Sequence, residues 1–186
     1  MKPVILASAS PRRSSLLGNL GIPCVVRPSQ CDESCDLTDP EALVCELSRR
    51  KALCAQAGDD ETVIAADTVV CRGEHILGKP HTADGARAML RMLSGSSHAV
   101  YTGVTVRRGQ RVLTRAERTE VFFRDLPDRY IEDYIASGEP FDKAGGYGIQ
   151  GTAGAFVRRI EGDYFNVMGL PLCTLCQMLE ELEAEA

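Results

Sequence analysis

The sequence has no tryptophan and only ten other aromatic residues among its 186 residues. These aromatics do not alternate with basic residues, so nothing supports a stacking platform for single-stranded nucleic acid. Lysine and arginine total 21 against 26 acidic residues, which gives a net charge of −5 and disfavours a protein that binds RNA or DNA polymers. Only three histidines occur, and their wide spacing disfavours a histidine-bound zinc site.

Long apolar runs are also missing. No stretch reaches the ~18 residues that a membrane-spanning helix needs. The apolar stretch near the N-terminus is shorter than the ~7–15 residues of a signal peptide. With 44% hydrophobic and 25% charged residues, the composition is that of an ordinary globular protein. We therefore expect a cytoplasmic protein that makes no membrane contact.

Cysteine, in contrast, is abundant, with eight residues. Without a secretory signal, a disulfide framework is not expected. Only Cys173 and Cys176 have a metal-ligand spacing, and they lie on an apolar helical stripe without a partner pair. We expect all eight to be reduced and mostly buried, and we assign them no role.

Negative charge is concentrated near the C-terminus. Residues 161–186 contain six acidic residues and neither lysine nor arginine, so residues 1–160 are close to neutral. This balance allows a small cationic site for an anion.

Strand-like and helix-like patterns alternate along the chain. Strands are expected at 3–7, 25–26, 62–71, 98–106 and 112–123, the last two joined by a hairpin around Arg108-Gly109. Helices are expected at 11–20, 40–57, 83–93, 127–137 and 170–184, with a strand-like end to the glycine-rich segment 147–159 and a loop from Tyr164. This alternation predicts an α/β fold with a mixed sheet in one domain, residues 1–186.

The segment Ser8 to Arg13 follows the first strand and opens the first helix. Free amides, two hydroxyls and the guanidinium groups of Arg12 and Arg13 make it a candidate phosphate site. It is not a Walker loop, and it is also compatible with an ordinary capped helix that carries surface arginines.

Asp67 interrupts the apolar run 63–70. An ionised carboxylate in such a run is costly unless it is paired or reacts. A place at the carboxyl end of its strand would suit a ligand site in an α/β sheet. The alternative is a structural aspartate that bonds Thr68.

Three lysines stand in distinctive settings: Lys51, Lys79 and Lys143. Lys79 lies between Gly78 and Pro80, which fix its backbone and could present its charge to a phosphate. Taken singly, each lysine also fits a solvated surface. Glu33 could hold a cation or be surface charge.

The glycine-rich segment 145–151 contains a literal G-x-G-x-x-G. We reject a dinucleotide fold here, because the motif lies late, opens no predicted helix and lacks an acidic residue ~20 positions on. The glycines do allow the backbone to approach a ligand closely. The amide of Gln150 both donates and accepts, so it could pair with the carbonyl and N–H of uracil or thymine.

Together these segments resemble the Maf family of nucleoside triphosphate pyrophosphatases, also called septum-formation-inhibitor proteins, over nearly the whole chain. The motifs that carry the resemblance are Leu6-Ala7-Ser8-Ala9-Ser10-Pro11-Arg12-Arg13, Asp32-Glu33, Lys51-Ala52, Ala66-Asp67-Thr68-Val69-Val70, Leu77-Gly78-Lys79-Pro80, Ser97-His98-Ala99-Val100-Tyr101-Thr102-Gly103, Gly138-Glu139-Pro140, Asp142-Lys143-Ala144-Gly145, Gly148-Ile149-Gln150-Gly151 and Asn166-Val167-Met168-Gly169-Leu170-Pro171. The resemblance implies a mixed, elongated, twisted sheet flanked by helices, with a deep cleft between two lobes, as in inosine triphosphate pyrophosphatase.

The resemblance also implies a substrate class. One branch of the family has arginine at the position of Arg12, Ala-Asp-Thr at 66–68 and glutamine at 150; it hydrolyses dTTP, UTP and some modified pyrimidine nucleotides. The other branch favours 7-methyl-GTP and has Ser-Asp-Gln at 66–68. This chain resembles the first branch. The alternatives are the 7-methyl-GTP branch and a non-catalytic nucleotide-binding regulator of septum formation.

Residue roles follow from the resemblance and from the chemistry. Asp67 would accept the proton of the attacking water, and specificity would come from Arg12, Thr68 and Gln150. The phosphates would be bound by Ser8, Arg13, Lys51 and Lys79. Magnesium or manganese would be held by Glu33 and Asp67. The sequence leaves the oligomeric state open, a homodimer included.

Overall fold

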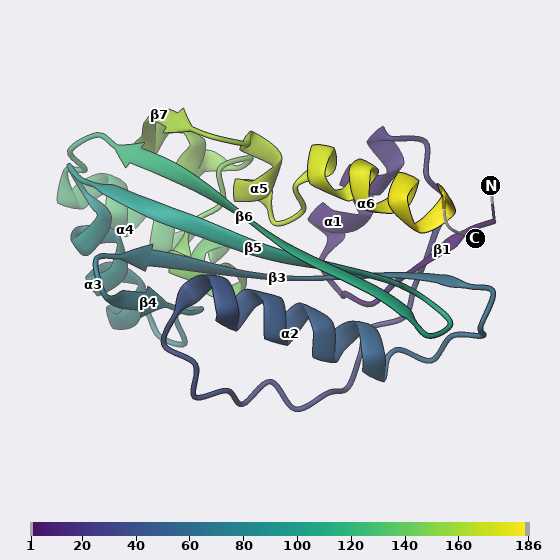
Figure 1. The fold of residues 1–186 in the computed structure, drawn as a ribbon. Coiled ribbons are helices and arrows are strands. Elements are labelled where there is room, and N and C mark those ends of the chain that lie inside the picture. The colour runs from purple at the N-terminus through teal and green to yellow at the C-terminus, as the bar shows by residue number, and fades with distance from the viewer. Residues whose placement is uncertain (1, 185–186) are drawn as a thin grey trace. The chain divides into compact units, whose positions relative to one another are not determined.

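In a computed structural model that describes residues 2–184, the chain is an α/β protein with a mixed seven-stranded sheet (Figure 1). The strand order is β2-β1-β3-β5-β6-β7, and β4 pairs with β3. The strands are β1 Val4–Leu6, β2 Cys24–Val26, β3 Thr62–Arg72, β4 His75–Leu77, β5 Ser97–Arg108, β6 Arg111–Phe123 and β7 Val157–Glu161. The α-helices are α1 Pro11–Asn19, α2 Pro40–Cys54, α3 Ala83–Leu93, α4 Asp128–Ala136, α5 Tyr164–Met168 and α6 Leu172–Ala184.

The sheet combines parallel and antiparallel pairs, as expected. Strand β1 runs parallel to both β2 and β3, with Ile5 opposite Val25 on one side and Val63 on the other. Strands β4 and β7 are antiparallel to β3 and β6. The three parallel strands need crossover connections, and α1 and α2 supply them.

The chain divides into two compact units. The first comprises the described parts of Met1–Asp67, Thr102–Glu117 and Gly169–Ala186. The second comprises Thr68–Tyr101 and Arg118–Met168. The deep cleft that the family resemblance implies stays a prediction.

In the first unit, α2 packs on one face of the sheet. The Ser48 Oγ lies 3.0 Å from the Thr105 Oγ1, which lies 2.9 Å from the Thr114 Oγ1. Helix and strand approach so closely that a Cβ on Gly103 would lie 2.2 Å from the carbonyl oxygen of Val44. Only glycine fits at that position of β5 without displacing backbone.

Helix α6 covers the opposite face of the first unit. Arg115, next to Thr114 on β6, forms an ion pair of 2.5 Å with Glu181 of α6. The Thr174 hydroxyl of α6 donates to the Glu117 carboxylate at 3.0 Å. Because successive residues of a strand point to opposite faces, α2 and α6 sandwich this part of the sheet.

The second unit has its own core, formed by β-strand residues, α3, α4 and the segment after α4. Its fully buried side chains include Leu90, Ile131, Tyr134 and Phe156. Burying each such side chain contributes about 1.5–3 kcal/mol. Helix α3 begins where the Thr82 hydroxyl accepts a hydrogen bond from the Gly85 N–H at 3.0 Å, which satisfies one free amide of the first turn.

Several sequence-based expectations need correction. Helix α2 ends at Cys54 rather than at 57, because Ala55 turns to an extended conformation. A short helix, α5, replaces the loop expected from Tyr164, and the Asp163 carboxylate stabilises it by accepting from the Phe165 N–H at 2.8 Å. The three-residue strand β4 was not expected, since it is too short to show alternation.

The cysteines are only partly as expected. All eight are free, but only Cys71 is buried. Cys54 and Cys173 are exposed, because they lie on helix faces turned away from the core. Within residues 2–184, none of the helices combines the length and hydrophobicity that a membrane crossing requires.

Candidate active site

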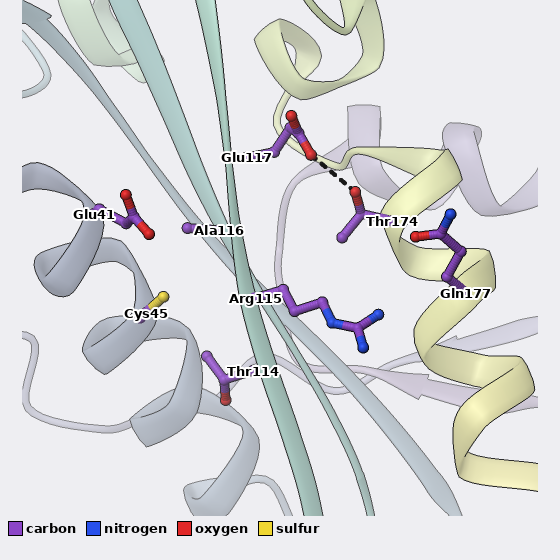
Figure 2. A pocket seen from close by; sticks show the side chains of 8 residues that line it. All are labelled: Glu41, Cys45, Thr114, Arg115, Ala116, Glu117, Thr174 and Gln177. Atoms are coloured by element: carbon purple, nitrogen blue, oxygen red, sulfur yellow. Dashed lines mark hydrogen bonds between the residues drawn. The ribbon is translucent and has the colours of Figure 1, made fainter.

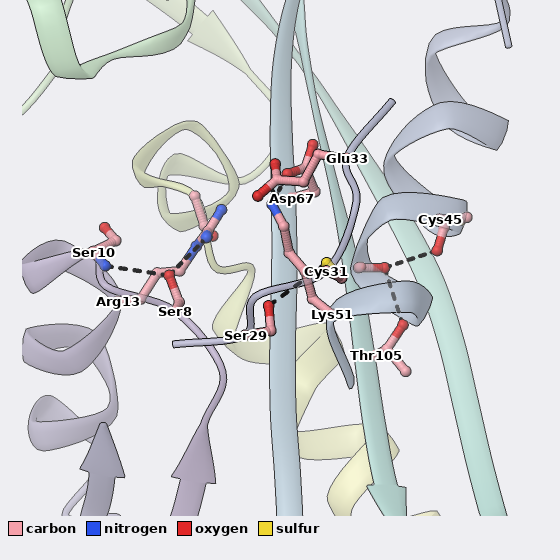
Figure 3. A network of polar contacts seen from close by, with 12 residues as sticks. Ser8, Ser10, Arg13, Ser29, Cys31, Glu33, Cys45, Lys51, Asp67 and Thr105 are labelled. Atoms are coloured by element: carbon pink, nitrogen blue, oxygen red, sulfur yellow. Dashed lines mark hydrogen bonds and ion pairs between the residues drawn. The ribbon is translucent and has the colours of Figure 1, made fainter. Parts of the chain in front are cut away.

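The loop after β1 is organised by Ser8 and Arg13, both predicted to bind phosphate. Ser8 is buried, and its Oγ accepts hydrogen bonds from the Ser10 N–H at 3.2 Å and from the Arg13 Nη1 at 3.0 Å (Figure 3). The Arg13 Nε donates to the Gly169 carbonyl at 2.7 Å. These bonds fix the guanidinium at the start of α1, where free amides and the helix dipole favour an anion.

Asp67 lies in the middle of β3, as the strand expected at 62–71 implies, and not at the carboxyl end of that strand. Its parallel neighbour is shorter, since β1 ends at Leu6, which pairs with Ile64. Asp67 therefore lies just past the carboxyl end of β1, on the strand next to the loop that carries Ser8. The site therefore lies beyond the carboxyl end of a parallel strand, where ligand sites of α/β folds are found. That strand is β1, and not the strand that carries Asp67.

Lys51 joins Asp67 and Glu33 in one cluster. Its Nζ lies 2.5 Å from the Asp67 Oδ1 and 2.9 Å from the Glu33 Oε2 (Figure 3). The Lys51 and Asp67 side chains are only 12% and 13% exposed, whereas that of Glu33 is 57% exposed. The buried carboxylate is thus paired, as an ionised group in an apolar strand must be, and Glu33 closes the cluster on the solvent side.

The cluster keeps its cations charged. Burial by itself would lower the pKa of Lys51, but the charges of Asp67 and Glu33 outweigh it and the pKa is raised. Burial lowers the pKa of Arg13 to about 10, against the opposing effect of the Asp67 charge. Both side chains are therefore positive at neutral pH. Two cations and two carboxylates share this part of the first unit.

The donor set permits a hard divalent cation. Glu33 and Asp67 bring carboxylate oxygens to the same ammonium group, and oxygen is the ligand that magnesium and manganese prefer. Across residues 2–184, no group of three or more histidine, cysteine or acidic side chains is arranged for a metal. Magnesium is usually held by one or two carboxylates together with substrate phosphates, and the two carboxylates of Glu33 and Asp67 are compatible with that mode of binding.

The other predicted site residues are placed as follows. Arg12 is half-buried in the first turn of α1, in the first unit. Thr68 follows Asp67 on β3 and is the first residue of the second unit. Lys79 and Gln150 are exposed residues of the second unit. The structure thus brings five predicted residues together in the first unit: Ser8, Arg13, Glu33, Lys51 and Asp67.

Two features escaped sequence reasoning. One is the Gly169 carbonyl that holds Arg13, which no local pattern could reveal because 156 residues separate the partners. The other is the support of the turn around Gln150, where the Tyr134 hydroxyl accepts from the Gly148 N–H at 3.2 Å and the Glu139 Oε2 accepts from the Thr152 N–H at 3.3 Å. Burial raises the pKa of the Tyr134 hydroxyl, so it remains a hydrogen-bond donor.

A separate hollow of about 590 Å³ lies in the first unit, over β6 and between α2 and α6 (Figure 2). It is lined by Glu41, Cys45, Thr114, Arg115, Ala116, Glu117, Thr174 and Gln177. None of these residues was predicted for the site. Two of these lining residues, Glu41 and Glu117, are acidic, and the lining arginine, Arg115, pairs with Glu181 of α6, so the hollow does not resemble a triphosphate site.

Comparison with known proteins agrees with the resemblance. A family described as Maf-like protein matches residues 3–182. A Geobacillus sp. (strain WCH70) protein named dTTP/UTP pyrophosphatase is 50% identical, over 98% of this chain and 99% of its own. Proteins with the same name from Moorella thermoacetica and Bacillus cereus (strain ATCC 14579) are 50% and 43% identical, over 96% and 100% of this chain and 94% and 98% of their own. The chain therefore belongs to the Maf-like protein family.

Proposed function

We propose that this protein is a nucleoside triphosphate pyrophosphatase that hydrolyses dTTP and UTP to the monophosphate and pyrophosphate. The observation that carries the proposal is the Asp67 carboxylate, nearly buried in an apolar strand and held by Lys51 in the same unit as Arg13. Full-length relatives at 43–50% identity that are named for this activity support the substrate class.

Asp67 is the proposed proton acceptor. The oxygen of a water molecule attacks the α-phosphorus, the bond from that phosphorus to the oxygen shared with the β-phosphorus breaks, and pyrophosphate leaves. The proton of the water passes to Asp67. Lys51 fixes Oδ1, which orients the carboxylate and leaves Oδ2 to face the water in our assignment.

Positive charge stabilises the leaving pyrophosphate. Arg13, held by Ser8 and Gly169, presents a fixed guanidinium, and Lys51 adds an ammonium. We assign Lys79 to the same phosphates on the family resemblance. A divalent cation held by Glu33 and Asp67 would neutralise charge on the phosphate oxygens as a Lewis acid.

Base recognition is assigned to Gln150, with Arg12 and Thr68 as further specificity positions; these three assignments rest on the resemblance. An amide that pairs with uracil or thymine leaves polar groups unsatisfied when the base is wrong, which gives discrimination. The cytoplasmic location expected above belongs to the same proposal, and so does a homodimer, which the sequence leaves open.

The Asp67→Asn variant tests the proton acceptor. Asparagine keeps an oxygen for Lys51 but is no base, so pyrophosphate release from UTP should fall by about 10²- to 10⁴-fold while the nucleotide still binds. Asp60→Asn is the matched control, because Asp60 is an exposed carboxylate that pairs with Lys2 in the same unit. Near-normal turnover of Asp67→Asn would refute the assignment.

A panel of nucleoside triphosphates with magnesium or manganese tests the activity itself. Monophosphate and pyrophosphate should appear with dTTP and UTP. If no triphosphate is turned over but nucleotides bind, the protein is a nucleotide-binding regulator instead. Preferred hydrolysis of 7-methyl-GTP would place it in the other branch of the family.

A further inference from the structure

One ammonium group lies between the two carboxylates that we assign to a divalent cation. The Lys51 Nζ is 2.5 Å from the Asp67 Oδ1 and 2.9 Å from the Glu33 Oε2 (Figure 3). The positive charge that joins the two carboxylates in the free protein is thus a side chain of the protein itself.

The charges in this part of the first unit balance without a metal. Arg13 and Lys51 are positive at neutral pH, Asp67 and Glu33 supply two carboxylates, and both carboxylates act on Arg13 as well as on Lys51. The Lys51 and Asp67 side chains are only 12% and 13% exposed, so water screens their charges weakly. A divalent cation that enters alone therefore adds an uncompensated double charge to a poorly hydrated site.

A nucleoside triphosphate changes this balance. Its phosphates bring more negative charge than one divalent cation neutralises, so the complex of the two is still an anion. The Arg13 guanidinium, held by Ser8 and Gly169 at the start of α1, is placed for such an anion. Lys51 repels the cation when it comes alone, but it attracts the phosphates when they come with the cation.

We propose that Lys51 excludes a divalent cation from Glu33 and Asp67 in the free protein, so that metal enters the site only together with nucleotide. This inference rests on the proposed function, in which the two carboxylates hold the metal and Lys51 binds phosphate. One side chain then has two opposite effects. Its charge weakens binding of the metal alone and strengthens binding of the metal–nucleotide complex.

Manganese is the probe, because the electron spin resonance signal of free Mn²⁺ is lost on binding. The Lys51→Met variant keeps an unbranched side chain but removes the charge. It should bind Mn²⁺ alone at least about tenfold more tightly than the wild type, since even in water a unit charge ~4 Å away repels a divalent ion by that much. It should bind the Mn²⁺ complex of a UTP analogue with a non-hydrolysable α–β bridge about tenfold or more weakly, because a charge-assisted hydrogen bond to phosphate is lost.

Three further variants separate charge from damage. Lys51→Arg keeps the charge and should bind Mn²⁺ alone as weakly as the wild type does. Lys2→Met breaks the exposed 2.6 Å ion pair with Asp60 in the same unit and should change neither affinity. Glu33→Gln, added to Lys51→Met, should remove most of the gain for Mn²⁺ alone, because the carboxylate that binds it is lost. A gain that survives Glu33→Gln would overturn the inference.

The opposite signs decide the outcome, because a damaged site binds both probes more weakly. A Lys51→Met variant that binds Mn²⁺ alone no more tightly than the wild type overturns the inference. So does a Lys51→Arg variant that binds it as tightly as Lys51→Met, because the effect is then not one of charge. The wild type gives a second test without any variant: equal affinities for Mn²⁺ alone and for the Mn²⁺–analogue complex would also overturn the inference.

These titrations involve no turnover, so they are distinguishable from the test of the proposed function. A protein that hydrolyses UTP while its Lys51→Met variant gains no affinity for Mn²⁺ overturns the inference alone. A protein that binds the complex but turns over no triphosphate overturns the proposed function, and the signs of the two titrations still decide the inference.

Discussion

Because His98 is buried, we predict that the second unit loses stability as the pH falls. Its side chain is 2% exposed, its ring meets the Phe123 ring edge-on at 4.9 Å, and its Nε2 shares a hydrogen bond of 2.8 Å with the Tyr147 hydroxyl. Among the described residues, none bonds to its Nδ1. Burial, with a smaller contribution from the charge of Arg72, lowers the pKa of His98 from 6.5 to about 4.

The sign follows from proton linkage. The native state keeps His98 neutral down to about pH 4, whereas the unfolded chain binds a proton below about pH 6.5. Stability contributed by the neutral ring is therefore complete above pH 6.5 and is lost as the pH falls towards 4, at up to about 1.4 kcal/mol per pH unit. Between pH 7 and pH 5 the free energy of unfolding should drop by about 2 kcal/mol through this one group.

Urea unfolding followed by tyrosine fluorescence measures this drop. All five tyrosines lie in the second unit and the chain has no tryptophan, so the signal reports the unit that contains His98. With a slope of about 2 kcal/mol per molar urea, the midpoint should fall by about 1 M between pH 7 and pH 5. The His98→Gln variant keeps a partner for Tyr147 but does not titrate. Between pH 7 and pH 5 its urea midpoint should therefore fall by about 1 M less than that of the wild type.

His81→Gln is the control, because His81 is an exposed histidine in the same unit. It should follow the wild type at every pH. The reasoning is refuted if His98→Gln loses stability with acid as steeply as the wild type does.

Two further predictions concern the first unit and the thiols. Gly103→Ala should destabilise the protein by at least about 2 kcal/mol, because the new Cβ would collide with the backbone of α2. Gly18→Ala should instead stabilise α1 by about 0.5–1 kcal/mol, because a Cβ there has nothing within 4 Å. Chemical denaturation followed by circular dichroism would compare the two variants. A thiol reagent should modify the exposed Cys54 and Cys173 first and the buried Cys71 only on unfolding, and mass spectrometry of the labelled peptides would show the order.

Local signals predicted the regular elements well. The helix at 83–93 was placed at its true bounds, because the sequence there has helical spacing followed by Ser94-Gly95. Helix α5 was missed because it is only five residues long and depends on one capping bond from Asp163. The strand β4 is shorter still, and it forms only because β3 offers it an edge.

The site was predictable in its residue types but not in its pairings. The apolar run marked Asp67 as unusual, yet nothing in the sequence says that Lys51, on a helix 16 residues earlier, is its partner. That contact depends on how α2 packs against the sheet. The same limit applies to the position of Asp67 beyond the end of β1, since the length of β1 relative to β3 is set by pairing between strands and not by either strand alone.

Gly151, the residue that follows Gln150, limits how the sequence can vary. Since a side chain at 151 would occupy the space of the Glu139 carboxylate, the two positions cannot change independently. A relative with alanine at the position of Gly151 should carry a shorter side chain at the position of Glu139, and would then need another acceptor for the amide of residue 152. Paired substitution at these two positions is thus the evolutionary signature of the support beneath the turn.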